Sequence, residues 1–243
     1  MKKVLLACTA ALACGSAFAQ SDIEAMDRGN VIPSFRLGFA VNGEAGPQGP
    51  AVPRTGHGIE IGLLGGSGDD SQTLSGGEFI RFGGQTFPSG QTVQHEYDYR
   101  FFEIAYRFRK FFGASQNFGI EALAGLGFAE LDLTTTGPGR SANEKISNGG
   151  LLGGFGLIWK FHPSVYLHPR FTFFGSSDEE GISAAGHLDV QVAWAVARNI
   201  VLRGGVASVA FVSSRAEANN GNSPNSRIAA SAGGVSLGLD VQF

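Results

Sequence analysis

The chain has 243 residues, of which 43% are hydrophobic and only 16% are charged. An ordinary soluble domain has about 25% charged residues, and the hydrophobic fraction excludes a disordered chain. The formal net charge of −3 argues against broad nucleic-acid binding. After residue 20, no run of 18 apolar residues predicts a transmembrane helix.

Residues 1–19 have the pattern of a cleavable signal peptide. Two lysines precede the apolar run 4–13, which is too short to span a bilayer, and a small-x-small sequence then ends at Ala19. We expect cleavage after Ala19. A lipoprotein signal with Cys14 as the lipid-bearing residue is the alternative. Because Cys8 and Cys14 both lie in this segment, the mature protein would have no cysteine for a disulfide or a thiolate metal site.

After an N-terminal segment, 20–33, apolar residues alternate with small or polar ones in nine segments. These cover residues 35–41, 59–63, 102–108, 118–128, 151–161, 165–173, 188–196, 200–212 and 235–243. Such alternation indicates strands with one apolar and one polar face. Its recurrence at lengths of about 9–11 residues is typical of strands that cross a membrane. We therefore predict an all-β fold, an antiparallel up-and-down transmembrane β-barrel over residues 34–243.

The expected connections alternate between short and long. The turns at 161–164 and 197–199 are tight, whereas the segments 66–94, 134–147, 176–184 and 213–228 are longer and polar. This arrangement is typical of transmembrane barrels, and single-chain bacterial barrels have even numbers of strands. Nine strands must then become ten, by adding a short strand at 78–82, or eight, by treating 34–42 as a pairing segment. We favour ten.

The last segment, 235–243, has an apolar residue at every odd position and ends on an aromatic residue. This last segment, the signal peptide and the run of amphipathic strands make the chain similar to the small outer-membrane barrels of Gram-negative bacteria. The chain resembles the outer-membrane-protein-A-like and opacity-protein group. The resemblance implies an integral position in the outer membrane, in contact with outer-membrane lipid and lipopolysaccharide. It also implies that the barrel-assembly machinery recognises Leu237, Leu239, Val241 and Phe243.

Two sets of side chains follow from the alternation. The polar faces carry ten charged residues: Arg36, Glu60, Glu103, Arg107, Glu121, Lys160, Arg170, Asp189, Arg203 and Asp240. In a narrow lumen they predict a salt-bridge network that plugs the barrel, and a narrow polar pathway for ions or small solutes is the alternative. The apolar faces carry aromatic residues near the turns that suit an interfacial girdle, namely Tyr106, Phe108, Trp159, Phe161 and Trp194.

Two pairs of residues could suggest a hydrolase. His162 and Ser164 lie two apart, as in some outer-membrane lipid A deacylases, but they fall in a tight turn. His187 and Asp189 could form an acid–base pair near the outer rim, as in ten-strand outer-membrane proteases. Their possible neighbours are Asp69, Asp70, His95 and Asp98.

We expect no enzyme, no catalytic residue and no cofactor. We also expect no metal site, because no His or carboxylate cluster has a defined ligand spacing. The expected role is structural, or an interaction with an unidentified extracellular ligand through the long loops. A channel is the alternative, and a hydrolase is less favoured.

Overall fold

The computed structural model describes residues 23–42, 55–178, 181–197, 200–215 and 226–242, and its elements are all strands. In chain order they are β1 (Ile23–Asn42), β2 (Thr55–Thr73), β3 (Ile80–Phe82), β4 (Gln85–Phe87), β5 (Thr92–Phe112), β6 (Phe118–Gly137), β7 (Arg140–His162), β8 (Val165–Asp178), β9 (Gly181–Ala197), β10 (Ile200–Arg215) and β11 (Ser226–Gln242). The all-β prediction is confirmed. Within the described ranges, no helix is long and apolar enough to cross a membrane.

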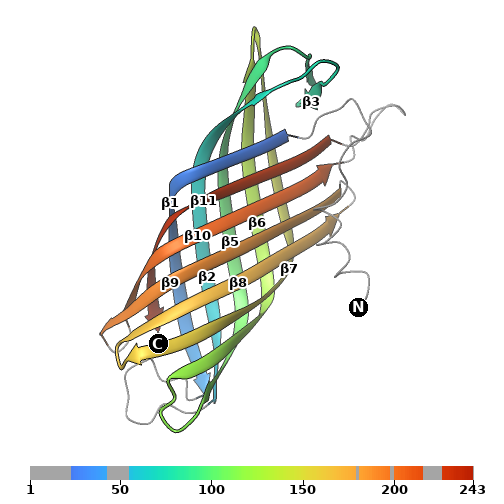
Figure 1. Cartoon of the computed structure of the whole chain (residues 1–243). Helices are drawn as coiled ribbons and strands as arrows, with labels where there is room; N and C mark the ends of the chain where they lie inside the picture. The colour runs from blue at the N-terminus through green and yellow to red at the C-terminus, as the bar shows by residue number, and fades with distance from the viewer. Residues whose placement is uncertain (1–22, 43–54, 179–180, 198–199, 216–225, 243) are drawn as a thin grey trace.

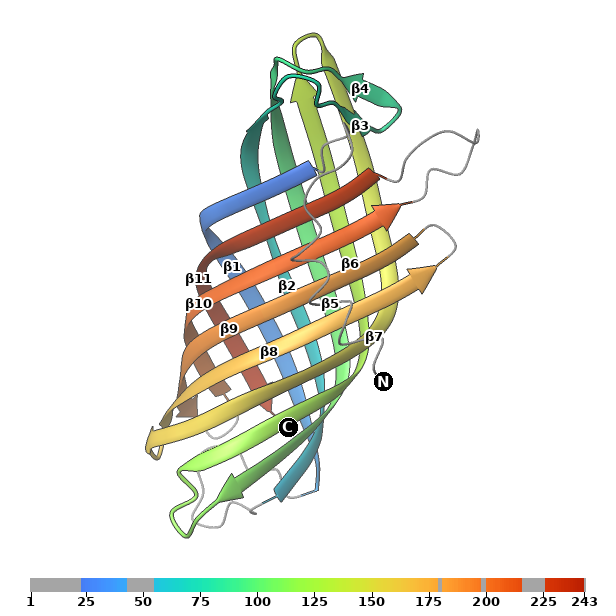
Figure 2. The same cartoon turned by 45° about the vertical axis from the view of Figure 1, so that its right-hand side comes forward.

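Nine of the strands form one large ring-like sheet (Figure 1; Figure 2), in the order β1-β11-β10-β9-β8-β7-β6-β5-β2. Sequence neighbours in the ring pair antiparallel, and β1 also pairs antiparallel with β2. On its other side β1 pairs with β11 in parallel, with Phe35 opposite Leu239. The first strand therefore has a hydrogen-bonded partner on both sides.

The predictions of ten or eight strands are wrong, and the count of nine alternating segments matches the ring. A ring of consecutive antiparallel strands needs an even number of strands only when its first and last strands also run antiparallel. Here the first and last strands run parallel. The extra strand expected at 78–82 exists as β3, but it pairs with β4 in a separate two-stranded sheet. The segment 34–42 is part of the ring, because β1 extends from Ile23 to Asn42.

Most of the residues expected in long loops belong to strands. The segment predicted as the loop 134–147 is the end of β6 and the start of β7, joined across two residues. The loops expected at 66–94, 176–184 and 213–228 are likewise shortened, because β2 runs to Thr73, β8 to Asp178 and β10 to Arg215. In Figure 1 the β6–β7 hairpin rises at the top, beyond the other ring strands. We call residues 65–73, 92–100, 130–137 and 140–149 the strand extension.

Outward-facing apolar side chains form a belt around the ring. On β5 the outward-facing residues from Phe102 to Phe112 are apolar except Lys110, and they span ten residue steps, or about 33 Å along the strand. At a tilt of about 40° this corresponds to a height of about 25 Å, the height of the apolar band of outer-membrane barrels. Large apolar side chains exposed on the other strands include Phe39, Leu63, Leu126, Phe155, Phe173, Val192, Val206 and Leu237. We call this surface the apolar belt.

Beyond the belt, apolar side chains move from the outside of the sheet to the inside. On β6, Phe128 is exposed on the outer face, whereas Leu131 and Leu133 are fully buried. They belong to a cluster, here called the extension core, that also contains Tyr97 and Phe211. The hairpin β3–β4 adds three buried side chains to the same cluster, Ile80, Phe82 and Phe87. Figure 2 shows this hairpin at the extended end of the ring.

Candidate functional site

The interior of the ring at the level of the apolar belt is occupied by charged side chains. Nine of the ten expected residues are buried there: Arg36, Glu60, Glu103, Arg107, Glu121, Arg170, Asp189, Arg203 and Asp240. They come from eight strands of the ring. Successive side chains of a strand point to opposite faces of the sheet, so every second residue of each strand faces the interior. The tenth residue, Lys160, is half-buried near the short-turn end, with its ammonium 4.1 Å from the centre of the Phe111 ring.

Glu60 on β2 lies at the centre of this network. Its Oε2 accepts a hydrogen bond from Arg107 Nη1 at 2.6 Å, and its Oε1 accepts one from Arg170 Nη1 at 2.5 Å. Arg36 Nε approaches the same Oε1 to 3.7 Å. Three guanidinium groups from β1, β5 and β8 thus surround one carboxylate, and charge-assisted bonds of this kind are among the stronger ones in proteins.

The network spreads outward from Arg170 and Arg36. Arg170 Nη2 donates to Glu103 Oε1 at 2.9 Å, and Arg36 Nη2 donates to Asp189 Oδ2 at 3.1 Å. Glu121 lies 3.8 Å from Arg170 Nη1. Glu121 extends the network toward the short-turn end of the ring, where its other two partners, Arg109 and His168, lie.

Two members of the network were not among the residues predicted from the sequence. Arg109 Nε donates to Glu121 Oε2 at 2.7 Å, and His168 Nε2 lies 3.3 Å from Glu121 Oε1. The sequence could have identified both residues. Arg109 lies two positions from Arg107 on β5 and His168 two positions from Arg170 on β8, so each shares the inner face of its neighbour. With them the buried interior contains five arginines and five carboxylates.

A second group of polar contacts joins the last three strands. Arg203 Nη2 lies 2.7 Å from Asp240 Oδ1, and Arg203 Nη1 donates to Gln191 Oε1 at 2.7 Å. Gln191 Nε2 in turn donates to Ser236 Oγ at 2.5 Å. β9, β10 and β11 are therefore connected across the interior as well as through their backbones. Opposite charges in such contacts offset the cost of removing each group from water.

The group of residues that could have formed a protease-like site is not brought together. His187 Nε2 lies 3.6 Å from Asp189 Oδ2 inside the ring. Asp69 and Asp98 line the outer face of the sheet. His95 is buried in the strand extension, hydrogen-bonded through Nδ1 to Thr135 Oγ1 at 3.0 Å. The sequence alternation predicted similar heights along the ring for these residues, but it did not predict which face of the sheet each side chain occupies.

The other predicted residues lie on the outside of the ring or at its short-turn end. His162 Nδ1 and Ser164 Oγ are 2.9 Å apart in an exposed turn. The expected girdle residues Tyr106, Trp159, Phe161 and Trp194 are exposed and Phe108 is partly exposed. Of the expected assembly signal, Leu237 is exposed, Leu239 and Val241 are partly exposed, and Phe243 lies outside the described residues.

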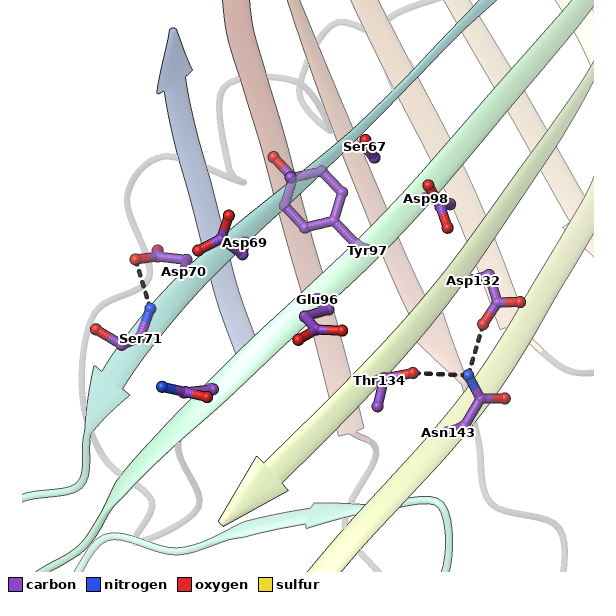
Figure 3. A pocket seen from close by; sticks show the side chains of 12 residues that line it. Ser67, Asp69, Asp70, Ser71, Glu96, Tyr97, Asp98, Asp132, Thr134 and Asn143 are labelled. Carbon is purple, nitrogen blue, oxygen red and sulfur yellow. Dashed lines mark hydrogen bonds between the residues drawn. The ribbon is translucent and has the colours of Figure 1, made fainter. Parts of the chain in front are cut away.

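The strand extension carries a polar hollow of about 780 Å³ on its outer face, here called the acidic hollow. Figure 3 shows its lining side chains on β2, β5, β6 and β7, which include Asp69, Asp70, Glu96, Asp98 and Asp132. Asn143 Nδ2 donates to Asp132 Oδ1 at 2.6 Å and to Thr134 Oγ1 at 2.9 Å. This surface was not predicted from the sequence, because its residues fall in segments expected to be loops.

Across the described part of the chain, no three His, Cys, Asp or Glu side chains are grouped so that they could hold a metal ion. Comparisons with protein-family models, with curated proteins and with solved structures find no match. The arrangement of apolar and charged side chains is therefore the basis for inferring a function.

Proposed function

We propose that this protein is an integral β-barrel of a Gram-negative outer membrane, with a plugged polar interior and a structural or surface-interaction role. The observation that carries the proposal is the apolar belt around a ring whose interior is charged. Soluble proteins rarely expose contiguous apolar patches larger than a few hundred Å². In lipid the same surface is buried, and a sheet closed on itself leaves no unpaired edge.

The belt sets the proposed position in the membrane. Its side chains contact outer-membrane lipid, and lipopolysaccharide surrounds the end that carries the strand extension. The signal peptide directs export, and the last strand is recognised by the barrel-assembly machinery. The short turns after Phe112 and His162 then face the periplasm, and the acidic hollow faces the outside of the cell.

A structural or binding role is favoured over a channel because two obstructions lie in series along the interior. The charge network around Glu60 fills the level of the belt, and the extension core with the β3–β4 hairpin fills the level above it. Interaction with an extracellular ligand would use the outer face of the strand extension, where the acidic hollow lies. A rigid sheet presents such a surface with little loss of conformational entropy on binding.

Insertion is tested by co-flotation of the refolded protein with phospholipid vesicles, using two arginine substitutions on the same face of β6. Leu126→Arg places a charge in the belt, where an exposed apolar side chain stands, and is expected to destabilise the inserted protein by about 2–4 kcal/mol. Thr136→Arg, in the exposed part of the strand extension, is the matched control and is expected to float like the wild type. Equal flotation and stability of both variants would contradict the proposed membrane level.

Conductance across a planar bilayer tests the plugged interior. The wild type is expected to give no stable single-channel steps. Regular steps from the inserted protein would instead support the alternative function, a channel for ions or small solutes.

A further inference from the structure

A groove of about 530 Å³ lies on the outside of the ring, where the apolar belt meets the strand extension. Its lower wall is a row of four apolar side chains, Phe35, Leu63, Phe102 and Phe128. These residues stand directly opposite one another in the pairing of β1 with β2, β2 with β5, and β5 with β6. The row is therefore a continuous apolar surface across four strands.

The next row of outward-facing residues, on the strand-extension side of the apolar row, lacks a side chain at one position. It contains Gly65 on β2, which lies opposite Arg100 on β5, and Arg100 lies opposite Glu130 on β6. A Cβ atom at Gly65 would meet only the backbone oxygen of Tyr99, at 3.3 Å, and no side chain within 4 Å. The missing side chain leaves a space above Leu63 that is bordered by the Arg100 side chain.

Arg100 gives the rim of the groove a positive charge. Its side chain is 80% exposed, and its Nη1 lies 3.8 Å from Glu130 Oε1, which is too long for a hydrogen bond. The other oxygen of Glu130 is held by Lys145 Nζ at 3.0 Å. Two cations thus share one carboxylate. The acidic residues Asp98 and Asp132 lie one row further from the belt, about 7 Å along the strands.

We propose that this groove binds a lipid with an anionic phosphate headgroup, whose acyl chain lies along the Phe35–Phe128 row and whose phosphate accepts hydrogen bonds from Arg100. The planar guanidinium group matches the spacing of phosphate oxygens. Asp98 and Asp132 disfavour a phosphate beyond the rim, so the headgroup is held at Arg100. The inference rests on the proposed function, because only a membrane-inserted ring brings the groove to headgroup level.

The test measures which lipids remain bound after extraction. Protein inserted in vesicles of equal parts phosphatidylglycerol and phosphatidylcholine is taken into mild detergent, and retained lipids are counted by native mass spectrometry. We expect the wild type to retain phosphatidylglycerol preferentially. Arg100→Gln should weaken this retention about tenfold, equivalent to roughly 1.4 kcal/mol. Arg140→Gln, at the first residue of β7, removes the same charge outside the groove and should retain the lipid.

A second variant tests the groove without changing its charge. Gly65→Leu fills the space above Leu63 and leaves Arg100 in place, so it should also lower retention of phosphatidylglycerol. Equal retention by the wild type and Arg100→Gln, equal retention of both lipids, or displacement of the lipid by free glycerol phosphate would overturn the proposal. Co-flotation is measured on the same samples. A wild type that does not float refutes the proposed function, whereas a floating wild type without lipid preference refutes only this inference.

Discussion

Replacing Glu60 by glutamine tests whether the interior charges hold the ring together. The side chain of Glu60 is buried, and three guanidinium groups lie within 3.7 Å of its oxygens. Glutamine keeps the shape but removes the negative charge, so Arg36, Arg107 and Arg170 would face a neutral amide. Breaking a buried ion pair costs about 3–5 kcal/mol, and since the amide oxygen still accepts one bond, we expect the lower end of that range.

The assay is urea unfolding of the protein inserted in vesicles, followed by tryptophan emission. The sequence has two tryptophans, and both Trp159 and Trp194 are exposed on the apolar belt. Their emission therefore reports contact with lipid. Glu96→Gln, on the exposed outer face of the strand extension, makes the same chemical change and should alter the unfolding free energy by no more than about 0.5 kcal/mol.

A double variant separates the loss of the pair from other effects. Removing Arg107 together with Glu60, as Glu60→Gln with Arg107→Gln, should cost less than the sum of the two single changes, because the two groups interact directly. An unfolding midpoint of Glu60→Gln equal to that of the wild type would refute the reasoning. Such a result would mean that water already solvates these charges, as in a hydrated pathway.

Two further changes probe other parts of the ring. A Cβ atom at Gly125 would clash with the carbonyl oxygen of Ile104, so Gly125→Ala should reduce the yield of folded protein in cold gel electrophoresis. Gly149→Ala should not, since its nearest atom is 3.9 Å away, and equal yields would count against the close approach of β5 and β6. Burial lowers the pKa of His95 to about 4, against an opposing effect of Asp70. Because the unfolded chain takes up this proton near pH 6.5, stability is fully present above that pH and falls by up to about 3 kcal/mol as the pH drops toward about 4. His95→Gln should lose this step in protease protection of the strand extension, and an unchanged pH profile would contradict the assignment.

The alternation in the sequence was sufficient to locate the ring strands at the level of the belt. Each of the nine predicted segments overlaps one strand of the ring, from 35–41 in β1 to 235–243 in β11. The rule that single-chain bacterial barrels have even strand counts, by contrast, predicts the wrong number of strands. That rule depends on the relative direction of the first and last strands, a long-range property that no local pattern contains.

The strand extension was missed for a different physical reason. On β6 the apolar residues occupy even positions up to Phe128 and odd positions from Leu131 onward. A search for one continuous apolar face stops at this change and leaves the remainder as a polar loop. Two successive phases on one strand are the pattern expected where a strand passes from lipid into water, as we propose for β6, because in water the apolar side faces inward.

The interior residues were predictable as a set, but their pairings were not. Parity alone placed Glu60 and Arg170 on inner faces of β2 and β8, strands that are not neighbours in the sheet. Their 2.5 Å contact crosses the interior. It depends on the tilt and register of all the strands between them.

The parallel pairing of β1 with β11 has a kinetic consequence. Every other ring contact joins consecutive long strands that pair antiparallel, whereas Ile23 must find Ile228 and Gly38 must find Gln242. These partners stand near opposite ends of the sequence, and contacts between distant segments form slowly because the loop-closure entropy must be overcome first. The slowest step in assembly is therefore the joining of this seam, and until it forms the sheet has two unpaired edges. A machine that shields the edge of β11 until β1 arrives would accelerate this step more than any other.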